Sequence, residues 1–254
     1  MAVPKMPGFR EECEMLAALE TFDPEAFRGD DRVPQAVCSF VLALALIYND
    51  CKDAIYAHVA LAASTPDGPP RRSKVWGAIS GAQQHAFRGF AGLLHELFGL
   101  IRENGDVLRH DVFVSLVQHL PSPSREAWVA LVNVASDATP TDKLGRRLLR
   151  LRNKVLSHYD PKAIFTGYTE HFLGPEKRDD RAYVSRGASM RATRFFFADA
   201  AATGYLRSVV GSEDTTTLME ELAEIIDRIN YGLMMIVGTF IQRRGYSFRQ
   251  EAEQ

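Results

Sequence analysis

Apolar side chains recur at helical spacing along most of this 254-residue chain. The run 37–47 is apolar on nearly every face, and Pro34 stands just before it, at a position typical of the first residue of a helix. A helix that is apolar all round is typical of the centre of a protein. We therefore predict a central helix that becomes amphipathic after Tyr48 and ends near Ala63.

A second long helix is predicted downstream of a clear break. The segment 65–72 contains three prolines and a glycine, which interrupt regular structure. Ser73 is a residue type that caps helices, and apolar residues follow it at helical period as far as Glu103. Asn104-Gly105 is a typical end signal, so we expect the helix to stop there.

The rest of the chain also favours helices. An amphipathic stretch covers Phe9–Thr21, and the later predicted helices span 106–120, 124–135, a segment that begins at Thr141 or Asp142, 197–210 and 213–243. Residues 174–196 are charged and lack helical period, and a short β-hairpin is expected near residues 181–197. We predict an all-α fold with one domain over 1–254, a core over about 9–243, an irregular insertion at 174–196 and a polar tail at 245–254.

Composition narrows the class of protein. Hydrophobic residues make up 46% of the chain and the formal net charge is −2, so any affinity for nucleic acid must come from a local patch. Cys13, Cys38 and Cys51 are too few for a disulfide framework and indicate a reducing compartment. The chain start has no secretory pattern, and the longest apolar runs are shorter than a membrane span. These features predict a cytoplasmic protein with no membrane partner.

The most informative chemistry lies in Arg152-Asn153 and, six positions after the arginine, His158. A histidine exchanges protons near neutral pH, whereas an arginine stays charged and binds phosphate oxygens through several donors. Strand scission of RNA by transesterification requires a base for the ribose 2′-hydroxyl and a cation for the charge on the phosphate. These two residue types supply both functions.

This spacing of an arginine, a polar residue, four further residues and a histidine resembles the motif of the HEPN superfamily of all-helical proteins. The resemblance implies a helical bundle, a homodimer in which two motifs face each other, and metal-independent cleavage of RNA. It also implies that Arg152, Asn153 and His158 form the catalytic site. A defence or toxin–antitoxin setting, with a neutralising partner protein, would accompany such an activity.

The predicted helix explains why a second copy is expected. On an ideal helix Arg152 and His158 point about 120° apart, so their side chains converge poorly within one straight segment. Either the helix breaks near Ser157 or a second subunit completes the site. A basic stripe on the same helix could guide an RNA backbone toward the motif, although such a run is more often a solvated face. The stripe consists of Lys143, Arg146, Arg147, Arg150 and Lys154.

Other polar residues offer weaker candidates. Asn49 and Asp50 follow a fully apolar helical run, so either one could orient Arg152, or the helix could simply reach solvent there. Tyr159 directly follows the motif and is a further supporting candidate. The pair Arg243-Arg244 carries no added signal.

Metal and cofactor sites find little support in the sequence. His95-Glu96 begins like a zinc-protease motif, but Gly99 occupies the position of the second histidine. Cys51 and His58 share a helix face without further ligands, and zinc requires four. No phosphate-binding or dinucleotide-binding glycine pattern occurs, so no metal and no cofactor are predicted.

Two functions from different classes remain open. The first is a metal-independent endoribonuclease that uses Arg152 and His158. The second is a non-catalytic helical module that binds RNA or a partner protein, in which the same residues are structural. The accessibility of both side chains in one cleft would distinguish the two.

Overall fold

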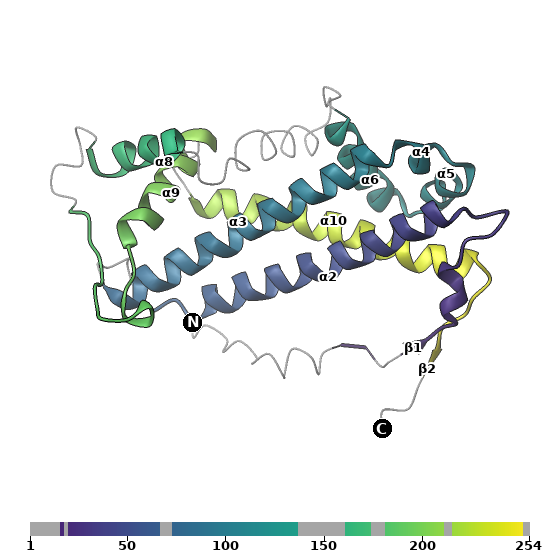
Figure 1. Cartoon of the computed structure of the whole chain (residues 1–254), viewed down its shortest axis with the longest axis horizontal. Helices are drawn as coiled ribbons and strands as arrows, with labels where there is room; N and C mark the ends of the chain where they lie inside the picture. The colour runs from purple at the N-terminus through teal and green to yellow at the C-terminus, as the bar shows by residue number, and fades with distance from the viewer. Residues whose placement is uncertain are drawn as a thin grey trace. The chain divides into compact units, whose positions relative to one another are not determined.

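The fold is all-α, as the sequence predicts (Figure 1). The computed structural model describes residues 16–17, 20–66, 73–136, 161–173, 181–210 and 215–250. Its α-helices are α2 (Gln35–Ala63), α3 (Lys74–Glu103), α4 (Gly105–Arg109), α5 (Asp111–Gln118), α6 (Ser122–Ala135), α8 (Pro161–Tyr168), α9 (Phe196–Val210) and α10 (Thr215–Arg243). Three short elements accompany them, namely the 3-10 helices η1 (Pro24–Phe27) and η3 (Met190–Ala192) and the π-helix η2 (Thr169–Leu173).

The predicted ends of the two long helices are confirmed. Helix α2 begins directly after Pro34 and ends at Ala63. The Ser73 hydroxyl accepts a hydrogen bond from the Trp76 amide at 3.2 Å, which makes it the N-terminal cap of α3. At the other end of α3 the Leu100 carbonyl accepts from both the Asn104 backbone amide at 3.2 Å and the Asn104 side chain at 2.8 Å, and the helix stops there.

The chain divides into two compact units. Unit 1 comprises Met1–Lys52, Glu96–Gly145 and Ile225–Gln254, and unit 2 comprises Asp53–His95 and Arg146–Glu224. Helices α2, α3 and α10 each contribute residues to both units. The prediction of one domain over 1–254 stays a prediction, because it depends on whether the two units unfold together.

Unit 1 has a core of large apolar side chains. Phe40 of α2, Phe113 of α5 and Trp128 of α6 meet there with ring centroids 5.3–6.3 Å apart, mostly edge to face. Apolar residues of α10 join them, since Ile229, Leu233, Ile236 and Phe240 are all buried. This core orders the carboxyl end of α10, which carries the two arginines considered below.

Unit 2 contains α8, η2 and α9, and α8 lies directly against α9 (Figure 1). Two glycines permit this contact. A Cβ atom on Gly167 would collide with the Ala201 carbonyl oxygen and the Tyr205 amide nitrogen, and one on Gly204 would collide with the Gly167 carbonyl. Glycine is therefore required for the close approach of these two helix backbones.

Strand structure is nearly absent from the described ranges. The two-residue strands β1 (Glu20–Thr21) and β2 (Arg249–Gln250) pair antiparallel. The hairpin expected near residues 181–197 is reduced to a single antiparallel bridge between Ser185 and Arg194. The predicted pairing thus occurs, but no ladder extends from it.

Two sequence-based expectations are wrong. The helix predicted over 106–120 is two helices, because His110 is extended and its ring Nδ1 accepts from the Val112 amide to cap α5. Helix α2 is buried on one side only, since Leu42 and Leu46 are exposed. A capping hydrogen bond interrupts the first pattern, and a face without a packing partner explains the second. Most of the amphipathic stretch Phe9–Thr21 lies outside the described residues, and its last two residues form strand β1.

None of the helices in the described ranges is both long and apolar enough to cross a lipid bilayer.

Candidate functional site

The predicted catalytic residues Arg152, Asn153 and His158 lie outside the residues that the structure describes. The same holds for Tyr159 and for the whole basic stripe, Lys143, Arg146, Arg147, Arg150 and Lys154. Of the predicted site, the described residues include only Asn49 and Asp50.

Asn49 and Asp50 are exposed on α2, which matches the alternative in which the helix simply reaches solvent there. Their neighbour Cys51 is buried, and burial, with a smaller contribution from the Asp50 charge, raises the pKa of its thiol to about 12. A thiol with so high a pKa is a poor nucleophile at neutral pH. Cys51 therefore acts as a small apolar core residue.

His58 is half-buried on α2 in unit 2, and burial lowers the pKa of its imidazole. Within the part of the chain that the structure describes, its Nδ1 atom has no hydrogen-bond partner. Among the described residues, no group of three or more histidine, cysteine, aspartate or glutamate side chains is arranged to hold a metal ion. The Cys51 and His58 pair thus finds no further ligand in this part of the chain.

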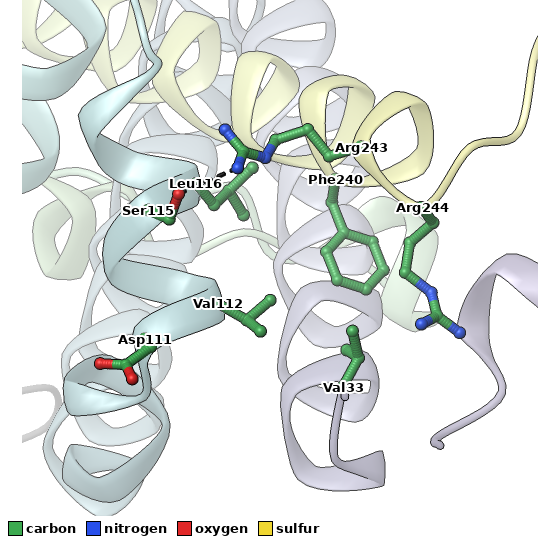
Figure 2. Close-up of a pocket in the computed structure, with 8 residues that line it drawn as sticks. All are labelled: Val33, Asp111, Val112, Ser115, Leu116, Phe240, Arg243 and Arg244. Carbon is green, nitrogen blue, oxygen red and sulfur yellow. Dashed lines mark hydrogen bonds between the residues drawn. The ribbon is translucent and has the colours of Figure 1, made fainter. Parts of the chain in front are cut away.

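A cavity of about 320 Å³ opens in unit 1 between the start of α2, helix α5 and the end of α10 (Figure 2). Val112 and Phe240 form part of its apolar lining, and Arg243 and Ser115 lie at its edge. The Arg243 guanidinium donates to the Ser115 hydroxyl oxygen at 2.9 Å. Asp111 also lines the cavity, but its carboxylate points away from Arg243 (Figure 2).

Arg244, on the other side of the cavity, has a structural role. Its guanidinium donates to the Ala26 carbonyl at 3.1 Å, to the Arg28 carbonyl at 2.7 Å and to the Asp30 carboxylate at 2.6 Å. These bonds hold the loop that precedes α2 against the end of α10. No local sequence pattern singles out Arg244, because the carbonyl and carboxylate groups that it binds are 214 or more residues away in the chain.

Asp30 completes this contact. Its carboxylate accepts from Arg244 and also from the Arg32 and Val33 amides, at 2.8 and 2.7 Å. The hydrogen bond from Arg244, followed by those from the two amides, lowers the pKa of Asp30 from 3.8 to about 2. The carboxylate is therefore charged at any physiological pH, and it stabilises the turn before α2.

The cavity has arginine cations but no histidine that could serve as the base for strand scission among the described residues that line it. The described residues that line it include no histidine, cysteine or lysine. The nearby His119 ring contacts the backbone carbonyl of Ser115 at 2.6 Å, not its hydroxyl group, so it does not activate Ser115. The cavity is consequently a partly apolar hollow with Arg243 and Arg244 at its edges, of which Arg244 is already bonded to the loop before α2.

Comparisons with known proteins do not assign the chain to a family: no protein-family model matches it, and no curated protein or solved structure is significantly similar to it.

Proposed function

We propose that this chain is an HEPN-like, metal-independent endoribonuclease that cleaves RNA by transesterification. The observation that carries the proposal is the spacing of Arg152-Asn153 and His158 in an all-α chain. The fold supports the proposal at the level of class, because the superfamily that the motif resembles is all-helical. A defence or toxin–antitoxin setting with a neutralising partner protein belongs to the same proposal.

In the proposed reaction His158 accepts the proton of a ribose 2′-hydroxyl, and the 2′-oxygen attacks the adjacent phosphorus. The bond from phosphorus to the 5′-oxygen breaks, and that oxygen takes a proton from solvent. Arg152 binds the phosphate oxygens and stabilises the charge that builds on them. Asn153 positions the substrate or one of the two residues. The products carry 2′,3′-cyclic phosphate and 5′-hydroxyl ends.

A homodimer is part of the proposal. Because Arg152 and His158 point about 120° apart on a straight helix, a second copy related by a two-fold axis would bring the missing group to each site. Sedimentation at micromolar concentration tests this, and we expect a dimer. A monomer that cleaves RNA at full rate would contradict the shared site without contradicting the reaction.

The test of the activity is cleavage of total RNA in EDTA by the full chain. His158→Ala should lower the rate by roughly 10²- to 10⁴-fold, the usual contribution of a positioned base. Arg152→Ala should lower it by roughly 10²- to 10³-fold, and Arg152→Lys should restore little, since a point charge cannot replace the bidentate contact. His95→Ala and Arg102→Ala remove the same side-chain types at exposed positions of α3 and serve as controls.

Each outcome separates the two functions that the sequence left open. Folded variants without cleavage, beside an active parent, would support the enzyme. A folded parent that binds RNA or a protein but cleaves nothing in this assay would favour the non-catalytic interaction module. Undiminished cleavage by folded His158→Ala would place the active site elsewhere.

A further inference from the structure

The segment Arg181–Phe197 in unit 2 combines positive charge with aromatic rings. It contains four arginines and four aromatic residues, and no aspartate or glutamate. The chain as a whole has a net charge of −2, so this segment is a local exception to the charge balance. From the sequence alone it is predicted as part of an irregular insertion with a short β-hairpin, and no binding role is assigned to it.

The segment is held in place by its own hydrogen bonds. Ser185 and Arg194 exchange two backbone hydrogen bonds at 2.9 and 2.8 Å, and the Thr193 hydroxyl both donates to and accepts from the Gly187 backbone at 3.1 Å. The Phe197 amide donates to the Tyr183 carbonyl at 3.3 Å. These bonds fix the loop at both of its ends.

Residues 194–197 alternate between inward and outward positions. Phe196 is buried, stacks on Tyr183 with ring centroids 5.0 Å apart, and lies against Gly77 of α3. Arg194 forms an ion pair with Asp199 at 3.1 Å. The residues between and after them face solvent, since Phe195 is 54% exposed and Phe197 is 36% exposed. Two phenylalanine rings are therefore presented at the surface by an anchored neighbour.

Three arginines of the segment are free to bind a ligand. Arg181, Arg186 and Arg191 are exposed, and within the described part of the chain none of them forms an ion pair or a side-chain hydrogen bond. Arg194, by contrast, is already paired. A single exposed arginine without an ion pair is common on protein surfaces and indicates no function. Here three of them lie in one segment with exposed aromatic rings and no carboxylate. The arginines match the phosphate charge of a nucleic acid, and the rings match its bases.

We propose that Arg181–Phe197 is a binding surface for single-stranded RNA, in which Arg186 and Arg191 contact phosphates and Phe195 and Phe197 stack on bases. A single strand is favoured over a duplex because its bases are free to leave their neighbours and stack on protein rings. The proposal deepens the proposed endoribonuclease function and rests on it for the choice of RNA as substrate class.

The test measures binding of a fluorescent 12-nucleotide polyuridine by the full chain with His158→Ala, which prevents cleavage during the measurement. The Arg186→Ala/Arg191→Ala pair should weaken binding at least tenfold and lower the slope of log K against log salt by roughly 1.4, the value for two lost phosphate contacts to a single strand. Phe195→Ala should weaken binding roughly 5- to 150-fold, and Phe195→Trp should retain it.

Matched controls remove the same groups elsewhere. Arg32→Ala/Arg102→Ala deletes two exposed arginines of unit 1, and Phe165→Ala deletes an exposed ring of α8. Circular dichroism establishes that every variant is folded. Equal losses in the control pair and the Arg186/Arg191 pair would overturn the proposal, as would a parent that does not bind the polyuridine. Binding of the parent to vesicles of an anionic phospholipid without binding to RNA would overturn it as well and identify a lipid surface instead.

The two proposals fail in different ways. Segment-dependent RNA binding without any cleavage by the unmutated chain would refute the endoribonuclease and leave the binding surface intact. Metal-independent cleavage that depends on His158, with binding unaffected by the segment variants, would refute the binding surface alone.

Discussion

Unit 1 buries large apolar side chains at its centre, whereas the described part of unit 2 packs through close backbone approach and leaves several aromatic rings in solvent. The largest side chains that are fully buried among the described residues, including Phe113, Leu131 and Leu233, all belong to unit 1. In unit 2 the contact between α8 and α9 depends on Gly167 and Gly204. Phe165, Phe195 and Phe197 stay at the surface of unit 2.

This difference indicates that unit 1 contributes mainly to the stability of the fold, whereas unit 2 presents side chains that are available for binding. Burial of a large apolar side chain contributes about 1.5–3 kcal/mol, so a dense core such as that of unit 1 stabilises a fold without exposing groups for binding. Exposed rings contribute little to folding and are available for a partner. The proposed catalytic motif and the proposed binding surface both fall within the range of unit 2, which includes Arg152, His158 and Arg181–Phe197.

The two tryptophans of the chain allow the units to be followed separately, since Trp128 belongs to unit 1 and Trp76 to unit 2. Trp76→Phe leaves Trp128 as the tryptophan reporter of unit 1, and Trp128→Phe leaves Trp76 as the reporter of unit 2. Coincident denaturation curves would indicate one cooperative domain, as the sequence predicts, whereas separate curves would indicate two.

The largest expected effect is that of Phe113→Ala, which removes a ring that is 1% exposed from the aromatic core of unit 1. Loss of its contacts with Phe40 and Trp128, together with the cavity that remains, should lower the free energy of unfolding by roughly 3–5 kcal/mol. Urea denaturation followed by Trp128 measures it. Val114→Ala, at an exposed position of the same helix, should change stability by less than about 0.5 kcal/mol. A loss of that small size for Phe113→Ala as well would contradict the assignment of the core.

The next effect concerns Gly167→Ala in unit 2. The added methyl group would strike backbone atoms of α9, which cannot move as a side chain does, so we expect a loss of roughly 1–3 kcal/mol. The matched variant Gly89→Ala on α3 meets nothing within 4 Å and should stabilise by roughly 0.5–1 kcal/mol. The signal of Trp76 should report both changes. A neutral Gly167→Ala would show that α8 and α9 do not depend on backbone contact.

The smallest effect is that of Asp30→Asn, which weakens the contact with Arg244 in unit 1. Since the pKa of Asp30 is about 2 in the folded protein and 3.8 ordinarily, its charge stabilises the fold above pH 3.8, and this contribution is lost as the pH falls toward 2. The Tm of Asp30→Asn should lie below that of the parent at pH 7, and the gap should close near pH 2. The exposed neighbour Asp31→Asn serves as the control, and an equal gap for it would assign the effect to net charge.

Periodicity predicted the long helices well, because their apolar positions and end signals lie within the same short stretches of sequence. Ser73 caps α3 and Asn104 ends it, as expected. Periodicity did not predict the break at His110, because a single histidine whose ring nitrogen caps a helix does not change the spacing of the apolar residues. The exposure of Leu42 and Leu46 was also missed, because an apolar helix pattern does not reveal which faces find partners.

For the candidate sites too, one part could be predicted from the sequence and the other required the structure. The motif at Arg152, Asn153 and His158 is readable from spacing alone, and its geometry remains a prediction. The binding surface at Arg181–Phe197 needed the structure. The structure shows that Phe196 is buried and that Arg194 is paired with Asp199. It also shows that Phe195, Phe197 and the other arginines of the segment face solvent.

The sequence by itself determined the all-α class, the ends of α2 and α3, and the residue types available for RNA chemistry, because each depends on interactions between near neighbours in the chain. Tertiary structure alone decided the contact of Arg244 with Asp30, the backbone approach of α8 and α9, and the outward face of Arg181–Phe197. These depend on groups brought together from distant positions. Contacts between distant residues produce no periodic pattern in the sequence, because the free energy that they contribute depends on how two surfaces fit together in the folded protein.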